Sequence, residues 1–312
     1  MTPAILQPGT LPHDVAAKLA AAYAVHRVDR GRDVMGLAPD VRSEVRGIAT
    51  RSMVGADAAL MAALPRLEIV AVFGAGLDAV DLDTARARGI RVTHTPDVLT
   101  EDTGEYAIAL VLALLRRVVE GDRFVRAGRW ASGALPNSTR VRGRRLGIVG
   151  LGRIGLAVAR RATALGMQVA WHGPHDKPEI GYPFHADLRA LARAVDVLLL
   201  TCPGGRATER MVDAGVLDAL GPHGFLVNIA RGSVVDEPAL VAALAERRIA
   251  GAALDVFRDE PNVPAALLGM EQVIVAPHIA STTEETRREI GELMLANLAA
   301  HFAGRPLPSA AL

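Results

Sequence analysis

The chain has 312 residues, enough for two domains with separate cores, and half of its residues are hydrophobic. Its 35 basic and 34 acidic side chains leave a net charge of +1, and no apolar run reaches the roughly 18 to 20 residues of a membrane span, so neither a nucleic-acid nor a membrane partner is expected. The start, MTPAILQPGT, lacks the features of a secretory signal, and Cys202 is the only cysteine, so we expect a cytoplasmic setting.

Short apolar runs alternate with helical segments in the first third of the chain. This alternation predicts a parallel sheet covered by helices on both faces. The predicted strands are 4–6, 24–28, 45–50, 69–73 and 90–93, and the predicted helices are 15–22, 56–64 and 82–88.

Residues 101–120 contain a longer apolar segment. The run IALVLALL in it is too long and too apolar for a surface helix. We expect one crossover helix here, buried between domains or subunits. Residues 126–145 are rich in glycine, arginine and turn formers and lack clear periodicity, which predicts a long arm or linker.

From Leu146 the alternation of strands and helices begins again, and it predicts a second doubly wound parallel sheet. The six predicted strands carry the runs LGIVG, QVAWH, VDVLLLT, GFLVNIA, GAALDVF and QVIVAP. Residues 282–302 predict one long amphipathic helix that returns to the first domain. The expected fold class is therefore α/β, with two doubly wound parallel-sheet domains.

A glycine loop lies between the first strand and the first helix of this second unit. Gly150, Gly152 and Gly155 have G-x-G-x-x-G spacing, in which the first glycine permits a tight turn, the second lets backbone approach a pyrophosphate and the third allows close packing of helix on strand. The phosphates of a dinucleotide would then bind N–H groups at the positive end of the helix. The alternative is a glycine-rich turn without a ligand.

Polar residues follow three later strands, at the sheet edge where open α/β sheets bind ligands. They are Arg231 in NIARGS, Glu260 in VFRDEP and His278 in VAPHIA. An arginine can neutralise the carboxylate of a 2-oxo acid, and a protonated histidine oriented by a carboxylate can protonate the developing alkoxide. Taken singly, each residue could also be an ordinary strand-end or loop residue.

The runs VGLGRIG, NIARGSVVDEPAL, GAALDVFRDEP and VIVAPHIASTT, together with LEIVAVFGAGLDAVDL, resemble the D-isomer-specific 2-hydroxyacid dehydrogenases in order and spacing. The segment IRVTHTPDVLTEDTGEYAIALVLALLRR is similar to the glyoxylate/hydroxypyruvate reductase branch. The resemblance implies a flavodoxin-like substrate domain at 1–97 plus 281–312 and a Rossmann-type cofactor domain at 98–280. It also implies a homodimer built around the crossover helix and the arm.

The resemblance further implies roles for individual residues. Arg231 would anchor the substrate, Glu260 would pair with the acid/base His278, and Asp255 would hold the nicotinamide amide. The substrate carboxylate would meet backbone N–H groups of the substrate loop, whose residues are Phe73, Gly74, Ala75 and Gly76, with Arg51 and Ser52 as further candidates. The other expected cofactor contacts are Thr103, Arg153, Ile154, Cys202, Pro203, Ile229 and Ala230, and no metal ligands are expected.

The cofactor prediction rests on the stretch QVAWHGPH. His172 lies 22 residues after Gly150, where an acidic residue would bind an unmodified ribose and repel a 2′-phosphate. The absence of this acidic residue favours NADP(H), since His172, His175, Lys177 and Arg153 lie nearby in the sequence and could contact the 2′-phosphate. NAD(H) is the alternative if His172 tolerates the 2′-phosphate without binding it.

The expected function is reduction of glyoxylate or hydroxypyruvate to the D-2-hydroxy acid with NADPH. One alternative keeps the fold and changes the substrate to phosphoglycerate, phosphite or a bulkier 2-oxo acid. Another is a dinucleotide-sensing corepressor or scaffold without catalysis, since this fold also supports such roles.

Overall fold

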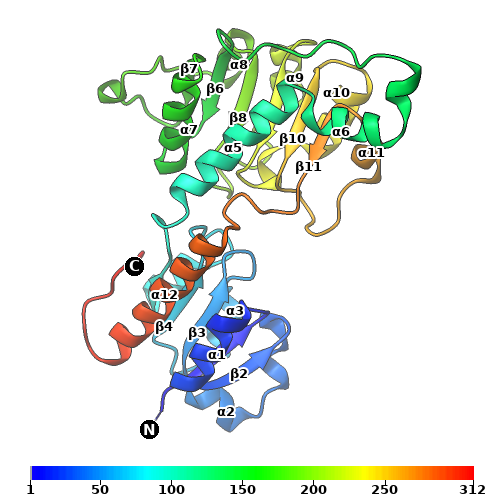
Figure 1. Cartoon of the computed structure of the whole chain (residues 1–312). Coiled ribbons are helices and arrows are strands. Elements are labelled where there is room, and N and C mark those ends of the chain that lie inside the picture. The colour runs from blue at the N-terminus through cyan, green and yellow to red at the C-terminus, as the bar shows by residue number, and fades with distance from the viewer. Residues whose placement is uncertain (1) are drawn as a thin grey trace. The chain divides into compact units, whose positions relative to one another are not determined.

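The computed structural model describes residues 2–312, and the chain divides into two compact units (Figure 1). Unit 1 contains the residues up to Leu99 together with Ser281–Leu312, and unit 2 contains Thr100–Ala280. Each unit has its own parallel sheet covered by helices, so the predicted fold class of two α/β parallel-sheet domains is confirmed.

Unit 1 has a five-stranded sheet in the order β2-β1-β3-β4-β5, in which every pair of neighbours is parallel. This is the flavodoxin-like order, and its direction of winding reverses between β1 and β3. The strands are β1 (Ala4–Pro8), β2 (Ala24–Val28), β3 (Val45–Arg51), β4 (Ile69–Phe73) and β5 (Arg91–Thr93).

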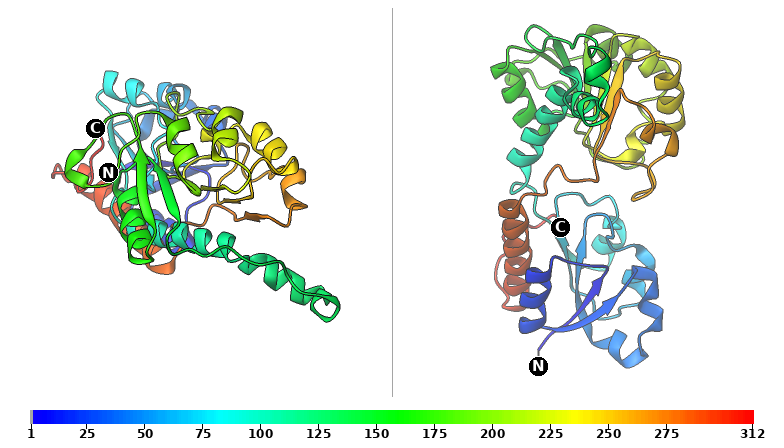
Figure 2. Two further views of the ribbon diagram at one scale, coloured as in Figure 1. Left: turned by 90° about the horizontal axis from the view of Figure 1, so that it is seen from above. Right: turned by 45° about the vertical axis from the view of Figure 1, so that its right-hand side comes forward.

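The helices of unit 1 cover both faces of this sheet. Figure 2 shows α1 and α12 side by side on one face, and α12 packs directly on β4. The helices are α1 (His13–Ala22), η1 (Gly31–Gly36), α2 (Pro39–Glu44), α3 (Ala58–Ala62), α4 (Leu82–Ala87) and α12 (Glu284–Phe302). The two short helices η1 and α2 fall in a segment for which the sequence predicted no element.

Unit 2 has a six-stranded parallel sheet in the order β11-β10-β9-β8-β6-β7. Its winding reverses between β6 and β8, so the glycine loop after β6 lies at the switch point, where such sheets bind ligands. The strands are β6 (Arg145–Val149), β7 (Gln168–His172), β8 (Val197–Leu200), β9 (Phe225–Asn228), β10 (Gly251–Leu254) and β11 (Val273–Val275). The helices between and after them are α7 (Arg153–Ala164), η3 (Pro178–Ile180), α8 (Leu188–Ala194), α9 (Ala214–Leu220), η4 (Gly232–Val234), α10 (Glu237–Ala245) and α11 (Ala265–Leu268).

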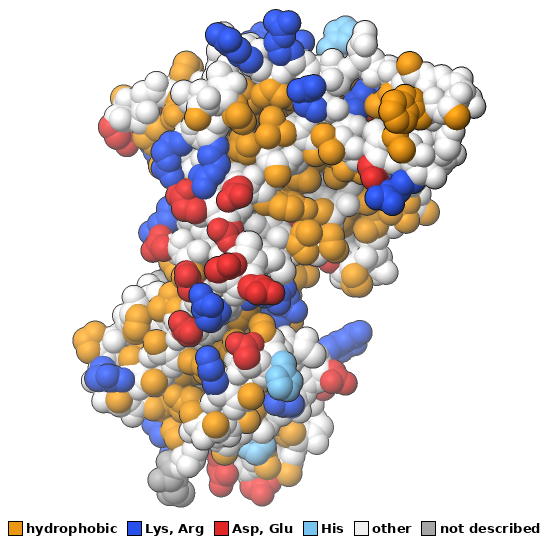
Figure 3. Space-filling model, viewed as in Figure 1, with side chains coloured by type: hydrophobic (Ala, Val, Ile, Leu, Met, Phe, Trp, Pro, Cys, Tyr) orange, Lys and Arg blue, Asp and Glu red, His pale blue; other side chains and the backbone are white. Residues whose placement is uncertain are grey.

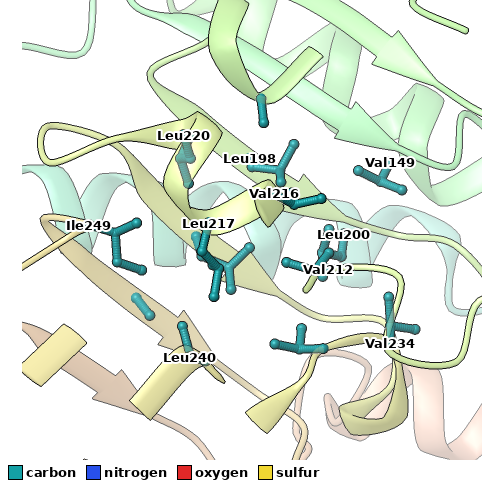
Figure 4. Close-up of a cluster of buried hydrophobic side chains, with 14 of the residues drawn as sticks. Val149, Leu198, Leu200, Val212, Val216, Leu217, Leu220, Val234, Leu240 and Ile249 are labelled. Carbon is teal, nitrogen blue, oxygen red and sulfur yellow. The ribbon is translucent and has the colours of Figure 1, made fainter. Parts of the chain in front are cut away.

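Strand β8 shows why the strands of unit 2 are continuously apolar. Leu198 and Leu200 point into the core shared with α9 and α10, where Figure 4 shows Leu198 near Val216. Val197 and Leu199 point into the core on the opposite face. Because successive side chains of a strand alternate between faces, a strand covered on both sides needs apolar residues at every position.

The expected single crossover helix over residues 101–120 is wrong, because the structure has two helices. Helix α5 (Thr100–Leu115) ends with the apolar run, Arg117 takes a left-handed conformation at φ 53°, and α6 (Val118–Arg126) follows with no buried residue. The burial of α5 comes from its packing on α7 and on strands of the same sheet. No helix in the described part of the chain is long and apolar enough to cross a membrane.

The predicted arm follows α6. It contains the short helix η2 (Arg129–Ser132) and otherwise no regular structure up to β6. Figure 2 shows this part of the chain extending away from the sheet of unit 2.

Candidate active site

The glycine loop between β6 and α7 is shaped by contacts that only glycine permits. Gly150 has φ +96°, and a Cβ there would lie 2.6 Å from the Cα of Cys202. A Cβ on Gly155 would lie 2.4 Å from the carbonyl oxygen of Gly150. The Thr201 hydroxyl donates to that same oxygen at 2.6 Å. The loop is therefore folded tightly against the end of β8, and it brings the start of α7 close to the sheet.

Gly152 differs from the other two glycines because a Cβ there would meet no atom within 4 Å. A side chain would therefore fill open space directly in front of α7. The first turn of α7 carries no acidic residue and begins with Arg153. Its N–H groups have no intrahelical acceptor, and the helix dipole favours an anion at this end. This space suits the phosphates of a dinucleotide.

The hydroxyl of Thr103 is a second feature, after the open space at Gly152, that fits a bound cofactor. It is buried on α5, and within residues 2–312 its hydroxyl has no hydrogen-bond partner. Helix α5 comes close to α7 near this residue, since a Cβ on Gly104 would lie 2.8 Å from the Cβ of Ala157. Buried hydroxyls are normally paired, so this one fits a contact with a bound cofactor.

The end of β7 lies beside the glycine loop. Gly150 N–H donates to the carbonyl of His172 at 2.9 Å, and the His172 Nδ1 contacts the carbonyl of His185 at 2.9 Å. The Lys177 ammonium donates to the carbonyl of Leu151 at 3.2 Å, so a positive charge lies next to the loop. His175 is exposed in the turn between these residues.

Arg231 is presented by a turn that follows β9. The buried Asn228 holds this turn, because its Oδ1 accepts from Ala230 N–H at 3.0 Å and its Nδ2 donates to the carbonyl of Arg231 at 3.0 Å. A Cβ on Gly232 would lie 1.9 Å from the carbonyl carbon of Phe257, so the turn lies directly against the segment that leads to Glu260. Arg231 also donates to the carbonyl of Ala230 at 2.7 Å.

Glu260 and His278 form a hydrogen-bonded pair. The His278 Nδ1 lies 2.7 Å from Oε2 of Glu260, and Oε1 accepts from Phe257 N–H at 3.0 Å. Burial alone would raise the pKa of Glu260, but the bonds from His278 and Phe257 N–H and the charge of Arg231 outweigh it and lower that pKa. Glu260 is thus a carboxylate at neutral pH, and the second ring nitrogen of His278, Nε2, is left for a substrate.

Asp255 fixes the backbone around His278. It is fully buried, and its two carboxylate oxygens accept from Ile279 N–H at 2.8 Å and from Ala280 N–H at 2.9 Å. The Asp255 carbonyl accepts from His278 N–H at 2.9 Å, and His278 itself takes the left-handed conformation at φ 55°. Burial raises the pKa of Asp255 despite these bonds. A strained residue held this firmly is typical of a functional site.

Several expected cofactor contacts lie at the carboxyl edge of the same sheet. Cys202 and Pro203 follow β8, and Ile229 and Ala230 follow β9. Ile154 is the second residue of α7 and packs against a core. Burial raises the pKa of the Cys202 thiol to about 11, so this cysteine stays protonated at neutral pH. Its contribution is therefore packing against the glycine loop and not ionic binding.

The predicted substrate loop lies in unit 1, after β4. Its carbonyls are engaged: Phe73 accepts from Ser52 N–H at 3.3 Å, Gly74 from Thr95 N–H at 2.9 Å, and Ala75 from the His94 ring at 2.8 Å. Among the described residues, the N–H groups of Gly74, Ala75 and Gly76 have no acceptor. Successive N–H groups in such a loop can bind a carboxylate.

Arg51 and Ser52 lie beside this loop, at the end of β3. Burial and the nearby charge of Arg287 lower the pKa of Arg51, which has no acidic partner within residues 2–312. The Ser52 hydroxyl is buried without a partner in the same part of the chain, and a Cβ on Gly74 would lie 2.3 Å from it. Two arginines without an acid favour binding of an anion here.

The structure thus gathers Arg231, Glu260, His278 and Asp255 in unit 2 and the substrate-loop residues with Arg51 and Ser52 in unit 1. Sequence reasoning missed Thr201 and Asn228, which hold the two key turns. A polar residue at the very end of an apolar strand was the available signal for both. Among residues 2–312 no group of three or more His, Cys, Asp and Glu side chains is placed to hold a metal ion.

Comparisons with known proteins find a matching family and several similar proteins. Residues 108–280 match the family described as D-isomer specific 2-hydroxyacid dehydrogenase, NAD binding domain. Hydroxyphenylpyruvate reductase of Plectranthus scutellarioides is 47% identical over 88% of this chain and 87% of its own length. Glyoxylate/hydroxypyruvate reductase A of Arabidopsis thaliana is also 47% identical, over 85% of each chain.

A solved structure covers nearly the whole chain. The NADPH-dependent glyoxylate/hydroxypyruvate reductase of Sinorhizobium meliloti, in complex with NADP and malonate, is 45% identical and has a TM-score of 0.93. The match covers 99% of this chain and 97% of that one.

Proposed function

Because the chain belongs to the D-isomer-specific 2-hydroxyacid dehydrogenase family, we propose that it reduces glyoxylate, hydroxypyruvate or a similar small 2-oxo acid to the D-2-hydroxy acid with NADPH. The observation that carries this proposal is the 2.7 Å pair of Glu260 and His278 at the edge of a sheet whose glycine loop suits a dinucleotide. The activities of the relatives from Arabidopsis and Sinorhizobium support the substrate class.

His278 is the proton donor in this proposal. Its Nδ1 is bonded to the Glu260 carboxylate, so the protonated ring presents Nε2–H to the substrate. As the carbonyl carbon is reduced, its oxygen gains negative charge and takes the proton from Nε2. Glu260 stabilises the imidazolium and fixes the ring orientation, and Asp255 fixes the backbone on which the ring stands. In the oxidation direction neutral His278 accepts the proton instead.

Arg231 neutralises the carboxylate of the substrate. Its guanidinium offers several N–H donors in a planar fork, which matches a carboxylate. Within unit 1, we propose that the N–H groups of Gly74, Ala75 and Gly76, with Arg51 and Ser52, form a second group able to bind a carboxylate.

A bound nicotinamide dinucleotide would supply the hydride. Its phosphates would meet the N–H groups at the start of α7, in the space in front of Gly152. Thr103, Cys202 and Pro203 would contact it from neighbouring elements, and Asp255 would accept from the nicotinamide amide. His172, His175, Lys177 and Arg153 would contact the 2′-phosphate. The basic groups at the end of β7 and the likeness to the NADPH-dependent Sinorhizobium enzyme favour NADPH over NADH.

The direct test is a steady-state assay of the purified protein. We expect the nicotinamide absorbance to fall when NADPH is mixed with glyoxylate or hydroxypyruvate, with a higher kcat/KM than for pyruvate. A preference for NADH of tenfold or more would overturn the cofactor proposal. Absence of turnover with every 2-oxo acid and both cofactors would overturn the proposed reaction.

A bulkier 2-oxo acid is a second candidate substrate. It is favoured by the relative from Plectranthus scutellarioides, a hydroxyphenylpyruvate reductase that is as similar to this chain as the relative from Arabidopsis. Including 4-hydroxyphenylpyruvate in the substrate panel decides between the two, since the true substrate gives the larger kcat/KM.

Glu260→Gln is expected to change the pH dependence of reduction. The reaction needs protonated His278, so kcat/KM falls as rising pH removes that proton. The neutral amide no longer stabilises the imidazolium, and this alkaline fall moves to lower pH. Because the pKa of Glu260 is lowered in the folded protein, the pair stabilises the fold at neutral pH and stops doing so only as the pH falls through that lowered pKa.

The measurement is kcat/KM against pH for both proteins at saturating NADPH. Asp259→Asn is the matched control, because Asp259 is an exposed carboxylate in the same turn and its side chain accepts from Asn262. It should leave the alkaline fall where it is. An unchanged pH profile in Glu260→Gln would mean that Glu260 does not act on His278.

We propose that the protein is a homodimer formed through α6 and the arm. Trp130 is 70% exposed, Val118 59% and Val125 53%, which is unusual for large apolar residues so close together in sequence. Figure 3 shows hydrophobic side chains over α5 and α6 on the visible face of unit 2. A second copy of the chain would bury them.

The double variant Val125→Asp, Trp130→Asp is expected to be monomeric, because two charges would have to be buried in the interface. Size-exclusion chromatography with light scattering at micromolar concentration measures this. Met35→Asp is the control, since Met35 is an equally exposed apolar residue of unit 1 at 64%, and it should remain dimeric. A monomeric wild type would refute the proposal.

A further inference from the structure

His172 lies where a ribose-binding acid would be expected, and its backbone is tied to the glycine loop. The carbonyl of His172 accepts from Gly150 N–H at 2.9 Å, and β7 pairs with β6 in register up to Val149 and His172. This position is held by the backbone whatever the side chain does. The charge and hydrogen-bonding state of the imidazole therefore decides what it offers to a ligand at the loop.

The contact with His185 fixes which ring nitrogen carries the permanent proton. The His172 Nδ1 lies 2.9 Å from the carbonyl oxygen of His185. A carbonyl oxygen can only accept, so Nδ1 is the donor in both charge states of the ring. The carbonyl is itself held, because His185 N–H donates to the carbonyl of Trp171 at 2.8 Å. Protonation of His172 consequently takes place at Nε2.

This tautomer gives His172 two different chemistries. In the neutral ring Nε2 carries a lone pair and accepts, which suits the hydroxyl of an unmodified ribose. In the charged ring Nε2 donates, which suits a 2′-phosphate. An aspartate or glutamate at this position could only accept, and an arginine could only donate.

Other charged and titratable groups lie on the elements around His172. They are Arg153 in the glycine loop, His175, Asp176 and Lys177 in the loop after β7, and His185 and Asp187 before α8. Arg153 and Lys177 are cationic side chains that attract a phosphate whatever the state of His172. Of this set only His175 and His185 are of a type that, like His172, changes charge between pH 5 and 8. Because His175 is itself a proposed contact of the 2′-phosphate, His185 provides the control.

We propose that His172 selects between the two cofactors by its protonation, so that the preference for a 2′-phosphate over a 2′-hydroxyl increases as the pH falls. This inference rests on the proposed binding of NADP(H) at the glycine loop. It makes the cofactor preference a function of pH instead of a fixed property. It also gives a way for a site with histidine in place of the acidic residue to accept either cofactor.

The test compares the binding of two cofactor fragments, adenosine 2′,5′-bisphosphate and 5′-AMP, by calorimetry at pH 6.0 and 8.5. For the wild type we expect the ratio of their affinities to fall about tenfold between these pH values, the effect of one charge-assisted hydrogen bond. In His172→Gln the ratio should change only as much as the titration of the 2′-phosphate requires. In His172→Arg it should stay high at both pH values.

The control is His185→Gln. It should keep the wild-type pH dependence, because the backbone carbonyl of residue 185 remains. Nitrogen NMR of the histidine rings gives an independent readout and should show His172 with its proton on Nδ1 at pH 8.5. A full pH effect in His172→Gln, or its loss in His185→Gln, would overturn the inference. If neither NADPH nor NADH binds to the wild type, the proposed function itself is wrong.

Discussion

His278→Asn is expected to lower kcat/KM for glyoxylate reduction by about 10²- to 10⁴-fold, the usual contribution of a positioned general acid. The binding constant of NADPH should change by no more than about twofold, because the glycine loop and α7 lie elsewhere on the sheet. Asparagine is the suitable replacement, since residue 278 has φ 55° and asparagine tolerates the left-handed conformation better than most side chains. The melting temperature should therefore stay close to that of the wild type.

The measurements are steady-state kinetics, NADPH titration and thermal unfolding of the same samples. His223→Asn is the control for loss of a histidine, because His223 is an exposed residue before β9. It should retain wild-type activity. If His278→Asn keeps more than about a tenth of the activity, another group supplies the proton and the assignment to His278 fails.

The fold class was predictable because its main signal is local. Each strand of the second sheet is a short apolar run, and β8 needs apolar residues at every position because both of its faces are covered. The order of strands was a different matter. Nothing in the runs themselves says that β6 lies between β7 and β8, because that order depends on how the connecting helices pack.

The crossover region shows where a pattern is misleading. The run IALVLALL predicted a helix over residues 101–120, and its apolar part is indeed helical up to Leu115. The break at Arg117 depends on the backbone taking φ 53° there, and arginine has no local preference for that conformation. Hydrophobic periodicity reports burial and not backbone conformation, so it could not detect the break at Arg117 that separates α5 from α6.

For the candidate site, the sequence identified the residues and the structure was needed for their contacts. Arg231, Glu260 and His278 could be named from the sequence because polar residues directly after apolar strands meet at one edge of a parallel sheet. The 2.7 Å bond between Glu260 and His278 required the structure, since the two residues are 18 positions apart in loops of different strands. Asn228 left only one sign in the sequence, a polar residue at the end of an apolar strand. The contact of His172 with the carbonyl of His185 left none, because a backbone acceptor has no residue pattern.

Replacement of Arg231 should produce the second large effect. Arg231→Met removes the proposed fork of charge-assisted hydrogen bonds to the substrate carboxylate, each worth roughly 1.5 to 3 kcal/mol. Loss of two such bonds corresponds to a fall in kcat/KM of about 10²- to 10⁴-fold. Much of the fall should appear as a higher KM, because the carboxylate is present in the ground state as well as in the transition state.

A merely structural role of Arg231 would also lower activity, so the substrate must be varied as well. The wild type should prefer glyoxylate strongly over its neutral amide, and Arg231→Met should lose most of that preference while NADPH binding is retained. Guanidinium ion at millimolar concentration should restore part of the activity of Arg231→Ala with glyoxylate but not with the amide. Arg258→Met is the control, because Arg258 is paired on the surface with Glu209 at 2.9 Å. If Arg231→Met discriminates between acid and amide as the wild type does, the carboxylate is bound elsewhere, and the N–H groups of the loop after β4 become the leading candidates for that contact.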